Sequence, residues 1–381
     1  MTLPLDGLTV LSLEQAVAGP FATRHLAEVG ARVIKVERPG VGDFARHYDE
    51  TVGGESSYFV WLNRGKESVE LDLKDPEDRA VIARLVERVD VVVQNLLPGS
   101  VARLGLDAAT LRAQRPELIH CSISGYGEPG PYAGRKAFDL LVQCETGMVE
   151  ATGSPEAGAR VGASVADIAA GMYAYAGILA ALVQRDRTGE GSTLEVTMLE
   201  ALGEWMSQPV YWSRYGERDW QRSGARHATI APYGSYPTGE GGAVFLCVQS
   251  HRDWVLLCER VLHRPELLED VRFLTNSDRV EHEPELASVL AESFSDRTAP
   301  EVLADLDAAG VANALVRTAR EFAAHPQLAA RDRWRSVRHP GGEMQAMLPP
   351  VTVAGSEPRM DPVPALGEHT EAVRAEVSGP G

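Results

Sequence analysis

The sequence is poor in cysteine and has no long apolar segment. Its four cysteines form no C-x-x-C pair, and each lies in an apolar or mixed run that is typical of a buried thiol. We therefore expect a reducing, cytoplasmic environment. The first residues lack the basic and apolar parts of a signal peptide, and the most apolar stretch, residues 172–183, is too short to span a bilayer. These absences predict a soluble protein with no membrane partner.

Lysine is also scarce, and the chain is strongly acidic. Asp and Glu number 54 against 37 Lys and Arg, which gives a formal net charge of −17, and only four of the basic residues are lysines. Long-range repulsion of polyanions argues against nucleic acid as a partner. A local anion site would rely mostly on arginine, whose planar guanidinium suits phosphate and carboxylate. With 44% hydrophobic and 24% charged residues, the 381-residue chain has the composition of a globular protein.

Several nucleotide- and metal-binding signatures are missing from the sequence. The turn at residues 14–20 joins a strand to a helix as in a dinucleotide-binding unit, but it holds one glycine where that fingerprint needs three. Gly65-Lys66 lacks the rest of a P-loop, and no G-x-S-x-G elbow is present. The histidines lack the spacing that places two ligands on one helical face. Dinucleotide, ATP and metal chemistry are therefore disfavoured, and we expect no metal site.

The first half of the chain alternates strand-like and helix-like patterns. Apolar or alternating runs predict strands at residues 8–13, 31–36, 68–73, 91–93, 118–123 and 192–198. Helices are predicted at about 20–29 and at 76–89 behind an Asp75 N-cap. Residues 168–182 are apolar on all sides and predict a buried helix that ends at a glycine cap at 189. Repeated strand–helix–strand units imply an α/β fold, with a large Rossmann-like domain built on a parallel sheet.

From about residue 209 the pattern changes to that of a smaller α+β domain. We predict a hairpin with its turn at residues 239–242, then helices near 252–262, 285–293 and 299–309, and a strand at 310–316. A helix at 321–334 and an extended proline-rich arm at 349–364 follow. The expected domains are 1–208, the first part of the large domain; 209–320, the small domain; and 321–381, a return to the large domain with a C-terminal arm.

Asp167 stands out among the ionisable residues. Small residues surround it in Gly162-Ala163-Ser164-Val165-Ala166-Asp167-Ile168-Ala169-Ala170-Gly171, which leaves its carboxylate accessible. It lies at the start of a predicted helix, whose free N–H groups and dipole are expected to keep it ionised. An ionised, accessible carboxylate is a possible nucleophile, whereas the ordinary interpretation of these residues is an Asp N-cap.

A set of motifs along the chain resembles one family. They are Gly19-Pro20, the segments 30–40 (GARVIKVERPG) and 42–43 (GD), Asn63-Arg64-Gly65-Lys66, 92–99 (VVQNLLPG), 124–127 (SGYG) and 364–370 (PALGEHT). In this order they are similar to the class III (CaiB/BaiF-type) CoA-transferase family, from residue 3 to about residue 375. The resemblance is weakest at 210–320, where substrate choice is expected to reside.

The resemblance implies a mechanism with Asp167 as the catalytic nucleophile. Asp167 would attack an acyl-CoA thioester to give a mixed anhydride, and the released thiolate would return to form an aspartyl-CoA thioester. An acceptor carboxylate would then take up the CoA. No nucleotide is hydrolysed, in keeping with the missing P-loop. No tightly bound cofactor is expected, because coenzyme A and its acyl thioesters are the substrates.

The resemblance also implies a coenzyme A site on the first domain. By position, Arg38 and Lys136 match its usual phosphate contacts, Arg103 adds a basic contact, and Asn95 and Leu96 form the wall for adenine and pantetheine. Each cation considered singly is more often a solvated surface residue.

Oxyanion donors are expected at two turns. At the first turn they are the amides of Ala16, Val17 and Ala18, and at the second they are the glycines around Gly241 and Gly242. Formyl-CoA-type members carry a glutamine near the first turn, whereas this chain has Val17 with Gln15 upstream. The source of the oxyanion donors therefore stays open.

The acceptor is expected to be a small dicarboxylate of the succinyl, mesaconyl, citramalyl or itaconyl type. Arg46-His47 and Arg226-His227 are two arginine–histidine pairs that could hold a second carboxylate, although loop solvation explains either pair equally well. The family's dimer is interlocked, and we expect an interlocked homodimer here.

Two other functions share this fold. An α-methylacyl-CoA racemase needs two bases, a histidine at the position of Phe138 and a glutamate near His251, and neither residue type is present. A non-catalytic acyl-CoA-binding protein would not need Asp167 in its setting of small residues. Transferase is therefore the favoured prediction, and the two others remain alternatives.

Overall fold

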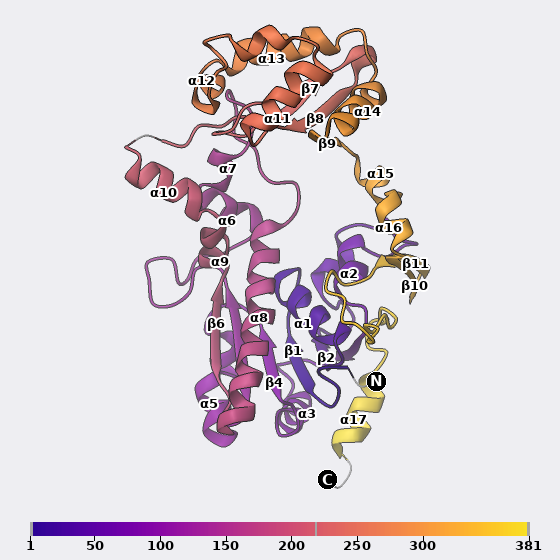
Figure 1. Cartoon of the computed structure of the whole chain (residues 1–381). Coiled ribbons are helices and arrows are strands. Elements are labelled where there is room, and N and C mark those ends of the chain that lie inside the picture. The colour runs from indigo at the N-terminus through magenta and orange to yellow at the C-terminus, as the bar shows by residue number, and fades with distance from the viewer. Residues whose placement is uncertain (1–2, 218, 379–381) are drawn as a thin grey trace. The chain divides into compact units, whose positions relative to one another are not determined.

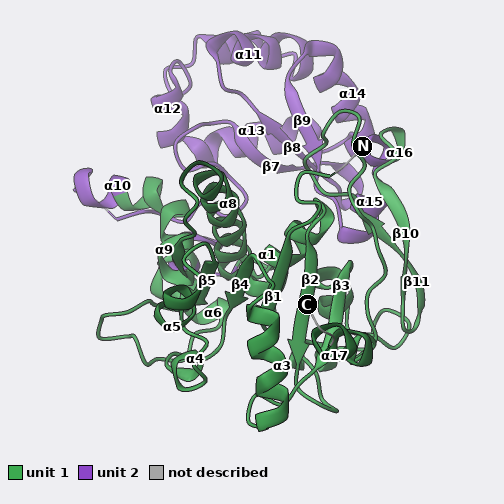
Figure 2. Ribbon diagram, turned by 90° about the horizontal axis from the view of Figure 1, so that it is seen from below, with its two compact units in different colours: residues 1–148, 161–210, 329–381 green, residues 149–160, 211–328 purple. Residues whose placement is uncertain are grey.

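The chain forms two units, which are coloured separately in Figure 2. The computed structural model describes residues 3–217 and 219–378. Unit 1 comprises Met1–Met148, Val161–Val210 and Ala329–Gly381, and unit 2 comprises Val149–Arg160 and Tyr211–Leu328. The domain boundaries at residues 208 and 320 stay a prediction.

Unit 1 is built on a six-stranded parallel sheet (Figure 1), as the alternating pattern predicted. Its strands are β1 (Thr9–Leu13), β2 (Arg32–Glu37), β3 (Lys66–Glu70), β4 (Val91–Gln94), β5 (Ile119–Ser124) and β6 (Thr193–Thr197), in the order β3-β2-β1-β4-β5-β6. The strand order reverses at β1, which pairs with both β2 and β4. Ligands of open α/β sheets bind at such a reversal, outside the carboxyl ends of the strands.

Helices cover both faces of this sheet. One apolar core joins the sheet to α1 (Ala18–Glu28), α6 (Asp139–Glu145), α8 (Val165–Thr188) and α9 (Met198–Trp205). A second core joins the other face to α3 (Pro76–Val86), α5 (Ala108–Gln114) and α17 (Thr370–Ser378). Shorter helices of this unit are η1 (Phe44–His47), α2 (Ser57–Leu62) and α4 (Ser100–Arg103). The predicted Asp75 cap of α3 is confirmed, since its side chain accepts hydrogen bonds from Glu77 and Asp78.

Helix α8 extends on both sides beyond its most apolar stretch. The apolar stretch at 172–183 was expected to be too short for a bilayer, but the helix has 24 residues and is the one helix, among the residues described, with a length and apolarity that would suit a membrane span. It packs along α1 and against β5, β6 and α9, so its buried side belongs to the core of unit 1 (Figure 1). Its other side, with Met172, Tyr173 and Val183, is exposed, so the prediction of a helix buried on all sides is wrong.

The segment that returns to unit 1 differs from its prediction. Instead of one helix at 321–334, the structure has α15 (Ala319–Ala323) and α16 (Pro326–Ala330), followed by the hairpin β10 (Trp334–His339) and β11 (Gly342–Met347). Pro326 begins a new helix because proline cannot continue one. Residues 349–364 contain no helix or strand, as the extended arm predicted.

Unit 2 contains a three-stranded antiparallel sheet and a layer of helices. The predicted hairpin is confirmed as β7 (Tyr233–Pro237) and β8 (Ala243–Cys247), joined through η2 (Gly239–Gly241), and β9 (Ala312–Leu315) pairs with β8. Its helices are α11 (His251–Leu256), η3 (Leu257–Val261), η4 (Pro265–Leu268), α12 (Asn276–Glu281), α13 (Glu283–Phe294) and α14 (Ala299–Ala309). Helices α7 (Met148–Ala151), α10 (Ser207–Tyr215) and α16 contain residues of both units.

The cysteines are free thiols, and their burial only partly follows the sequence. Cys121 and Cys258 are buried in the two units, and Cys247 is half-buried. Cys144 was expected to be buried, but it lies on the exposed side of the short helix α6. The apolar run around Cys144 predicts a helix, but it does not determine which side of that helix packs against the core.

Candidate functional site

Asp167 lies in the first turn of α8, and Ser164 takes the N-cap position that the ordinary interpretation assigned to the aspartate. Asp139, at the start of α6, accepts a hydrogen bond from the Ala166 amide at 2.8 Å and another from the Gln143 side chain at 2.7 Å. The Asp167 carboxylate itself has no hydrogen-bond partner within the residues that the structure describes. Its oxygens are therefore available for a bond to substrate.

The protonation of Asp167 differs from the sequence prediction. Burial, together with the nearby charge of Asp139, raises the pKa of the Asp167 carboxyl to about 7. The helix N-terminus was expected to keep this group ionised, but a pKa of about 7 leaves it partly protonated at neutral pH, because loss of hydration outweighs the helix dipole in this position. A carboxylate that is poorly hydrated when ionised is a stronger nucleophile than a carboxylate in water.

A hollow of about 270 Å³ opens next to Asp167. It is lined by Ser57, Tyr58 and Trp61 of α2 and by Ala163, Ser164 and Ile168 around the start of α8. Tyr48 contacts the ring of Tyr58 edge-on at 5.4 Å. Burial and the charges of Asp43 and Asp167 raise the pKa of Tyr48 to about 12. Aromatic walls and hydroxyl groups therefore surround a space that is suited to a small substrate.

The turn between β1 and α1 approaches the same place. A Cβ on Gly171, one helical turn after Asp167, would lie 2.7 Å from the Ala18 carbonyl oxygen. Ile168 packs against the small apolar cluster formed by Val17, Phe21 and Leu62. The start of α1 therefore lies close to the start of α8. The first amides of a helix have no partner within the helix and can bind negative charge.

The amide of Ala16 is not one of these free donors. Ala16 has a φ of 60°, and its N–H donates to Oδ1 of Asp43 at 3.0 Å. Gln15 is held from both sides by Asn95, whose Oδ1 accepts from the Gln15 amide and whose Nδ2 donates to the Gln15 carbonyl, each at 2.8 Å. The expectation that Ala16 supplies an oxyanion donor is therefore wrong, whereas the amides that follow it stay candidates.

A cluster of four charged side chains lies beneath this turn. Glu14, Lys35, Asp43 and Lys66, which we call the buried ion cluster, have no exposed side-chain surface. Lys35 Nζ is 2.9 Å from Asp43 Oδ2, and Lys66 Nζ is 2.7 Å from Glu14 Oε1. Burial, opposed by Glu14, lowers the pKa of Lys66 to about 7. Burial alone would raise the pKa of Glu14, but Lys66 and Lys35 hold it below its usual value.

The candidate coenzyme A residues follow the strand ends of unit 1. Arg38 follows β2, Asn95 and Leu96 follow β4, Arg103 ends α4, and Lys136 lies between β5 and α6. All three cations are exposed, and Arg103 donates to the Ser100 hydroxyl at 3.1 Å. In the described part of the chain, Arg38 and Lys136 have no ion-pair partner, so both are available to an anion.

The candidate acceptor arginines are already paired. Arg46 forms two hydrogen bonds with Glu37, at 2.7 and 2.8 Å, and stacks on the Phe59 ring at 3.6 Å. Arg226, in unit 2, is hydrogen-bonded to Glu283. The Arg46 guanidinium is therefore not free for a substrate carboxylate, which corrects the expectation from the sequence. Arg226 uses one nitrogen for Glu283 and is 36% exposed, so its role in substrate binding stays a prediction.

The histidines next to these arginines, His47 and His227, and the glycine turn at 239–242 form few contacts. His47 is exposed and its Nε2 lies 3.0 Å from the Val41 carbonyl oxygen, and His227 stacks on Tyr233 at 5.0 Å. In unit 2, the Gly242 amide donates within its own turn, to Gly239 at 3.2 Å, and is not a free donor. Gly241 is exposed with a φ of 72°, a conformation that suits glycine.

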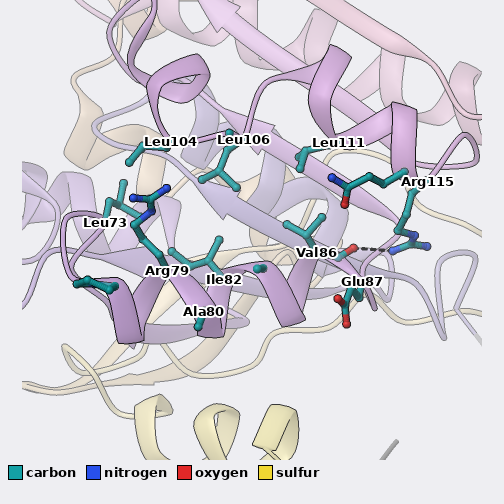
Figure 3. A pocket seen from close by; sticks show the side chains of 14 residues that line it. Leu73, Arg79, Ala80, Ile82, Val86, Glu87, Leu104, Leu106, Leu111 and Arg115 are labelled. Atoms are coloured by element: carbon teal, nitrogen blue, oxygen red, sulfur yellow. Dashed lines mark hydrogen bonds between the residues drawn. The ribbon is translucent and has the colours of Figure 1, made fainter.

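A larger cavity, of about 440 Å³, lies elsewhere on unit 1 (Figure 3). Apolar residues of α3 and of the segment around α5 line it, and Arg115 closes one end by donating to the Val86 carbonyl oxygen at 2.7 Å. It shares no lining residue with the hollow beside Asp167. Among residues 3–217 and 219–378, no group of three or more His, Cys, Asp or Glu residues could hold a metal ion.

The sequence profile of CoA-transferase family III matches residues 5–370. The chain belongs to this family. It is therefore a CoA-transferase, and its substrates include CoA thioesters. It is similar to the acetyl-CoA:oxalate CoA-transferase of Acetobacter aceti, with 37% identity over 99% of this chain and 96% of that protein. It is also similar to the human succinyl-CoA:glutarate CoA-transferase, with 34% identity over 98% and 86% of the two chains.

Solved structures of this CoA-transferase family support the same assignment. The crystal structure of a CaiB/BaiF family protein from Brucella suis superposes with a TM-score of 0.88 at 32% identity, covering 99% of this chain and all of the other. A Mycobacterium tuberculosis structure gives a TM-score of 0.86 at 30% identity, covering 98% and 99%. The predicted α/β fold with a parallel sheet is confirmed.

Sequence reasoning missed several residues of the transferase site. Asp139, Tyr58 and Trp61 come from segments distant from Asp167 and reach it only through the packing of α6 and α2 against unit 1. The one available signal was Asp139 itself, an acidic residue at the start of the short helix α6. Phe138 is exposed at the N-cap of α6, and His251 begins α11 in unit 2.

Proposed function

We propose that this enzyme moves CoA between an acyl-CoA thioester and a small dicarboxylate, with Asp167 as the nucleophile. The observation that carries the proposal is the Asp167 carboxylate, which is partly buried and has no hydrogen-bond partner in the described chain, and whose helix neighbours Ser164 and Ile168 line a hollow of about 270 Å³. Its relatives are named for oxalate, glutarate and mesaconate as acceptors, all of them small dicarboxylates.

The reaction begins when a carboxylate oxygen of Asp167 attacks the thioester carbonyl carbon. The carbon–sulfur bond breaks, CoA leaves as a thiolate with the bonding electron pair, and an acyl-aspartyl anhydride remains. The thiolate then attacks the aspartyl carbonyl carbon and releases the donor acid as a carboxylate. The acceptor carboxylate then attacks the aspartyl-CoA thioester, which releases the CoA thiolate and forms a new anhydride. The thiolate attacks the acyl carbonyl carbon of this anhydride, which forms the new acyl-CoA and frees the Asp167 carboxylate.

Each of these steps places negative charge on a carbonyl oxygen. The amides of Val17 and Ala18 at the start of α1 are our candidate donors, because Ile168 and Gly171 hold this helix start against α8. One such donor typically stabilises the transition state by about 3 kcal/mol.

The coenzyme A moiety would bind along the strand ends of unit 1. Arg38, Arg103 and Lys136 would contact its phosphates, and Asn95 and Leu96 would contact the adenine and pantetheine. The support is their exposure and their common position after the strands, together with the absence of an ion-pair partner for Arg38 and Lys136 in the residues described. For an enzyme with a net charge of −17, these cations are the local attraction for a polyanionic substrate.

The acceptor would occupy the hollow beside α2. Its volume suits a chain of a few carbons, and Ser57, Tyr58 and Ser164 offer hydroxyl groups to a second carboxylate. His47 of unit 1 stays a candidate contact. His227, Gly241 and Gly242 belong to unit 2 and stay candidates from the sequence alone, without a place in this hollow. Arg46 is excluded from this direct role by its ion pair with Glu37. Arg226, in unit 2, stays a candidate from the sequence alone.

The nucleophile is tested with Asp167→Asn. We expect transfer to fall to background, and hydroxylamine trapping with acyl-CoA to label Asp167 in the native enzyme and not in the variant. A variant that keeps substantial turnover would refute the assignment.

Stability measurements provide the control for folding of Asp167→Asn. Because the folded-state pKa of Asp167 is raised from 3.8 to about 7, its protonated form stabilises the native state below pH 3.8, and this contribution is lost as pH rises to about 7. Asn is neutral at every pH, so the variant does not lose this contribution. At pH 8 its free energy of unfolding should therefore exceed that of the native enzyme by roughly a few kcal/mol.

The substrate class is tested by mass spectrometry. Succinyl-CoA and acetyl-CoA are each incubated with oxalate, glutarate, mesaconate, citramalate and itaconate, and with matched aromatic and long-chain acids as controls. We expect new CoA thioesters from the dicarboxylates. Products only from aromatic or long-chain acids would overturn the dicarboxylate proposal while leaving the transferase assignment intact.

The enzyme is further proposed to be a cytoplasmic, interlocked homodimer. The exposed apolar side of α8, with Met172, Tyr173 and Val183, supports a protein contact on unit 1. Sedimentation on dilution should then show no stable folded monomer. A folded, active monomer would contradict this part of the proposal.

A further inference from the structure

The turn that leads into α1 has an unusual backbone conformation. Ala16 has a φ of 60°, in the left-handed region that alanine rarely adopts. Strained residues of this kind persist only where surrounding contacts hold them, and they gather at functional sites. The two residues that follow, Val17 and Ala18, carry the amides that we assign to oxyanion binding.

Glu14, Gln15 and Ala16 of this turn are each held by a partner. The Glu14 side chain accepts from Lys66 at 2.7 Å, and the Glu14 carbonyl oxygen is 3.3 Å from Lys35 Nζ. Asn95 holds Gln15 on both sides, as described above. Asp43 accepts the Ala16 amide with one oxygen and the Lys35 ammonium, at 2.9 Å, with the other.

The buried ion cluster is a costly way to stabilise a protein. Replacing buried ion pairs with apolar residues of similar volume is often neutral or stabilising, because desolvation opposes the attraction between the charges. Here the members of the cluster have no exposed side-chain surface, and three of them bond to the backbone of the segment 14–20. What the cluster controls is therefore the conformation of this segment.

We propose that Asp43, supported by the other members of the buried ion cluster, is a positioning residue that holds Ala16 in its left-handed conformation and thereby aims the first amides of α1 at the acyl oxygen on Asp167. Asp43 does not touch the reacting atoms. This inference rests on the proposed function, since it assigns a purpose to amides of the same site.

The kinetic test compares Asp43→Ala with a rescue variant. Asp43→Ala removes the acceptor of the Ala16 amide, and we expect kcat to fall about 100-fold, as for loss of an oxyanion donor, with the acyl-CoA KM nearly unchanged. Ala16→Gly, added to Asp43→Ala, should recover about tenfold in kcat, because glycine adopts a positive φ without strain. A merely structural role for Asp43 predicts no such rescue of kcat.

Two further variants serve as controls. Asp43 is also the N-cap of η1, and Asp75→Ala removes the corresponding N-cap aspartate of α3. Asp75 contacts none of the site residues, so this variant should leave kcat within about twofold. Lys35→Met with Asp43→Asn removes the two ion pairs of Lys35, with Asp43 and with Glu14, but keeps a side-chain acceptor for the Ala16 amide. It should retain kcat within about fivefold and provides a folded alternative if Asp43→Ala does not fold.

Hydrogen exchange tests the conformational part independently of turnover. The Ala16 amide should exchange at least about tenfold faster in Asp43→Ala than in the native enzyme, because its hydrogen bond is lost. Unchanged exchange, unchanged kcat, or an equal loss of kcat in the Lys35→Met/Asp43→Asn variant would overturn the inference. A native enzyme inactive with every donor would refute the proposed function, and exchange at Ala16 would still decide the positioning role.

Discussion

Asp167 illustrates how the surroundings of a single residue set its chemistry. Its carboxyl belongs to a helix start that favours negative charge, yet burial and Asp139 raise its pKa to about 7. The group is therefore partly protonated near neutral pH, and only the ionised form can attack a thioester.

The pH dependence of the reaction follows from this pKa. We expect kcat/KM for the acyl-CoA to increase about tenfold per pH unit below pH 7 and to level off above it, because the free enzyme must ionise Asp167. Asp139→Asn, which keeps an acceptor for the Ala166 amide but removes the charge, should move this limb to lower pH. Initial rates from pH 5 to 9 measure both effects, and a flat native profile would contradict the role of Asp167.

Arg38 provides a second prediction for a single residue. Arg38→Ala should raise the KM for the CoA ester several-fold more than it lowers kcat, because phosphate contacts contribute equally to ground-state and transition-state binding. Arg272→Ala, in an exposed pair with Asp270 of unit 2, is the matched control. Steady-state kinetics of both variants measure this difference, and a loss confined to kcat would contradict a role of Arg38 in binding the CoA phosphates.

How much of the site the sequence predicts depends on what each residue contacts. Asp167, Asn95 and Arg38 lie in continuous motifs, and the structure places all three at the carboxyl end of the sheet or beside it. Arg46 lies in a similar motif but pairs with Glu37, and no local pattern predicts that pairing. Tyr58 and Asp139 enter the site only by packing of distant segments.

Among the elements of unit 1, α8 matters most for the site. It carries Asp167 at its start and packs along α1 through small residues, so the two helix starts come together. Its composition predicted the helix and its glycine cap, which Gly189 provides with a φ of 76°. Its exposed side was not predicted, because an apolar run does not distinguish a protein core from a surface that awaits a partner.

Two glycines of α8 make a matched pair for testing this helix contact. A Cβ at position 171 would lie 2.7 Å from the Ala18 carbonyl oxygen, whereas at 177 it meets only a Leu194 methyl at 3.7 Å. Gly171→Ala should therefore destabilise the enzyme and lower kcat, whereas Gly177→Ala should stabilise it by up to about 1 kcal/mol through helix propensity. Denaturant unfolding measures both changes, and equal effects would contradict the close contact.

At the scale of the whole molecule, the C-terminal segment completes unit 1. Val373 and Val377 of α17 are buried in the core beneath the sheet, the Thr370 hydroxyl accepts the Glu70 amide at 2.9 Å, and Arg32 pairs with Glu376 at 2.7 Å. Segments from both ends of the chain therefore form one core.

Truncation after Leu366 tests this closure. Loss of α17 would expose apolar core residues of β3 and α3, and we expect a drop of the melting temperature of more than about 10 °C with reduced soluble yield. Arg32→Ala, which removes only the surface pair with Glu67 and Glu376, should shift the melting temperature by a few degrees at most. Differential scanning calorimetry compares the two, and an unchanged midpoint in the truncated chain would contradict a structural role for α17.

The sequence by itself determined the parallel sheet, the family and the candidate nucleophile Asp167. These features depend on local periodicity, helix caps and continuous motifs, each of which is contained in a short segment of the sequence. Only the tertiary structure decided the pKa of Asp167, the pairing of Arg46, the strained Ala16 and the buried ion cluster. These depend on desolvation and on contacts between segments distant in sequence, so they exist only once the chain has folded.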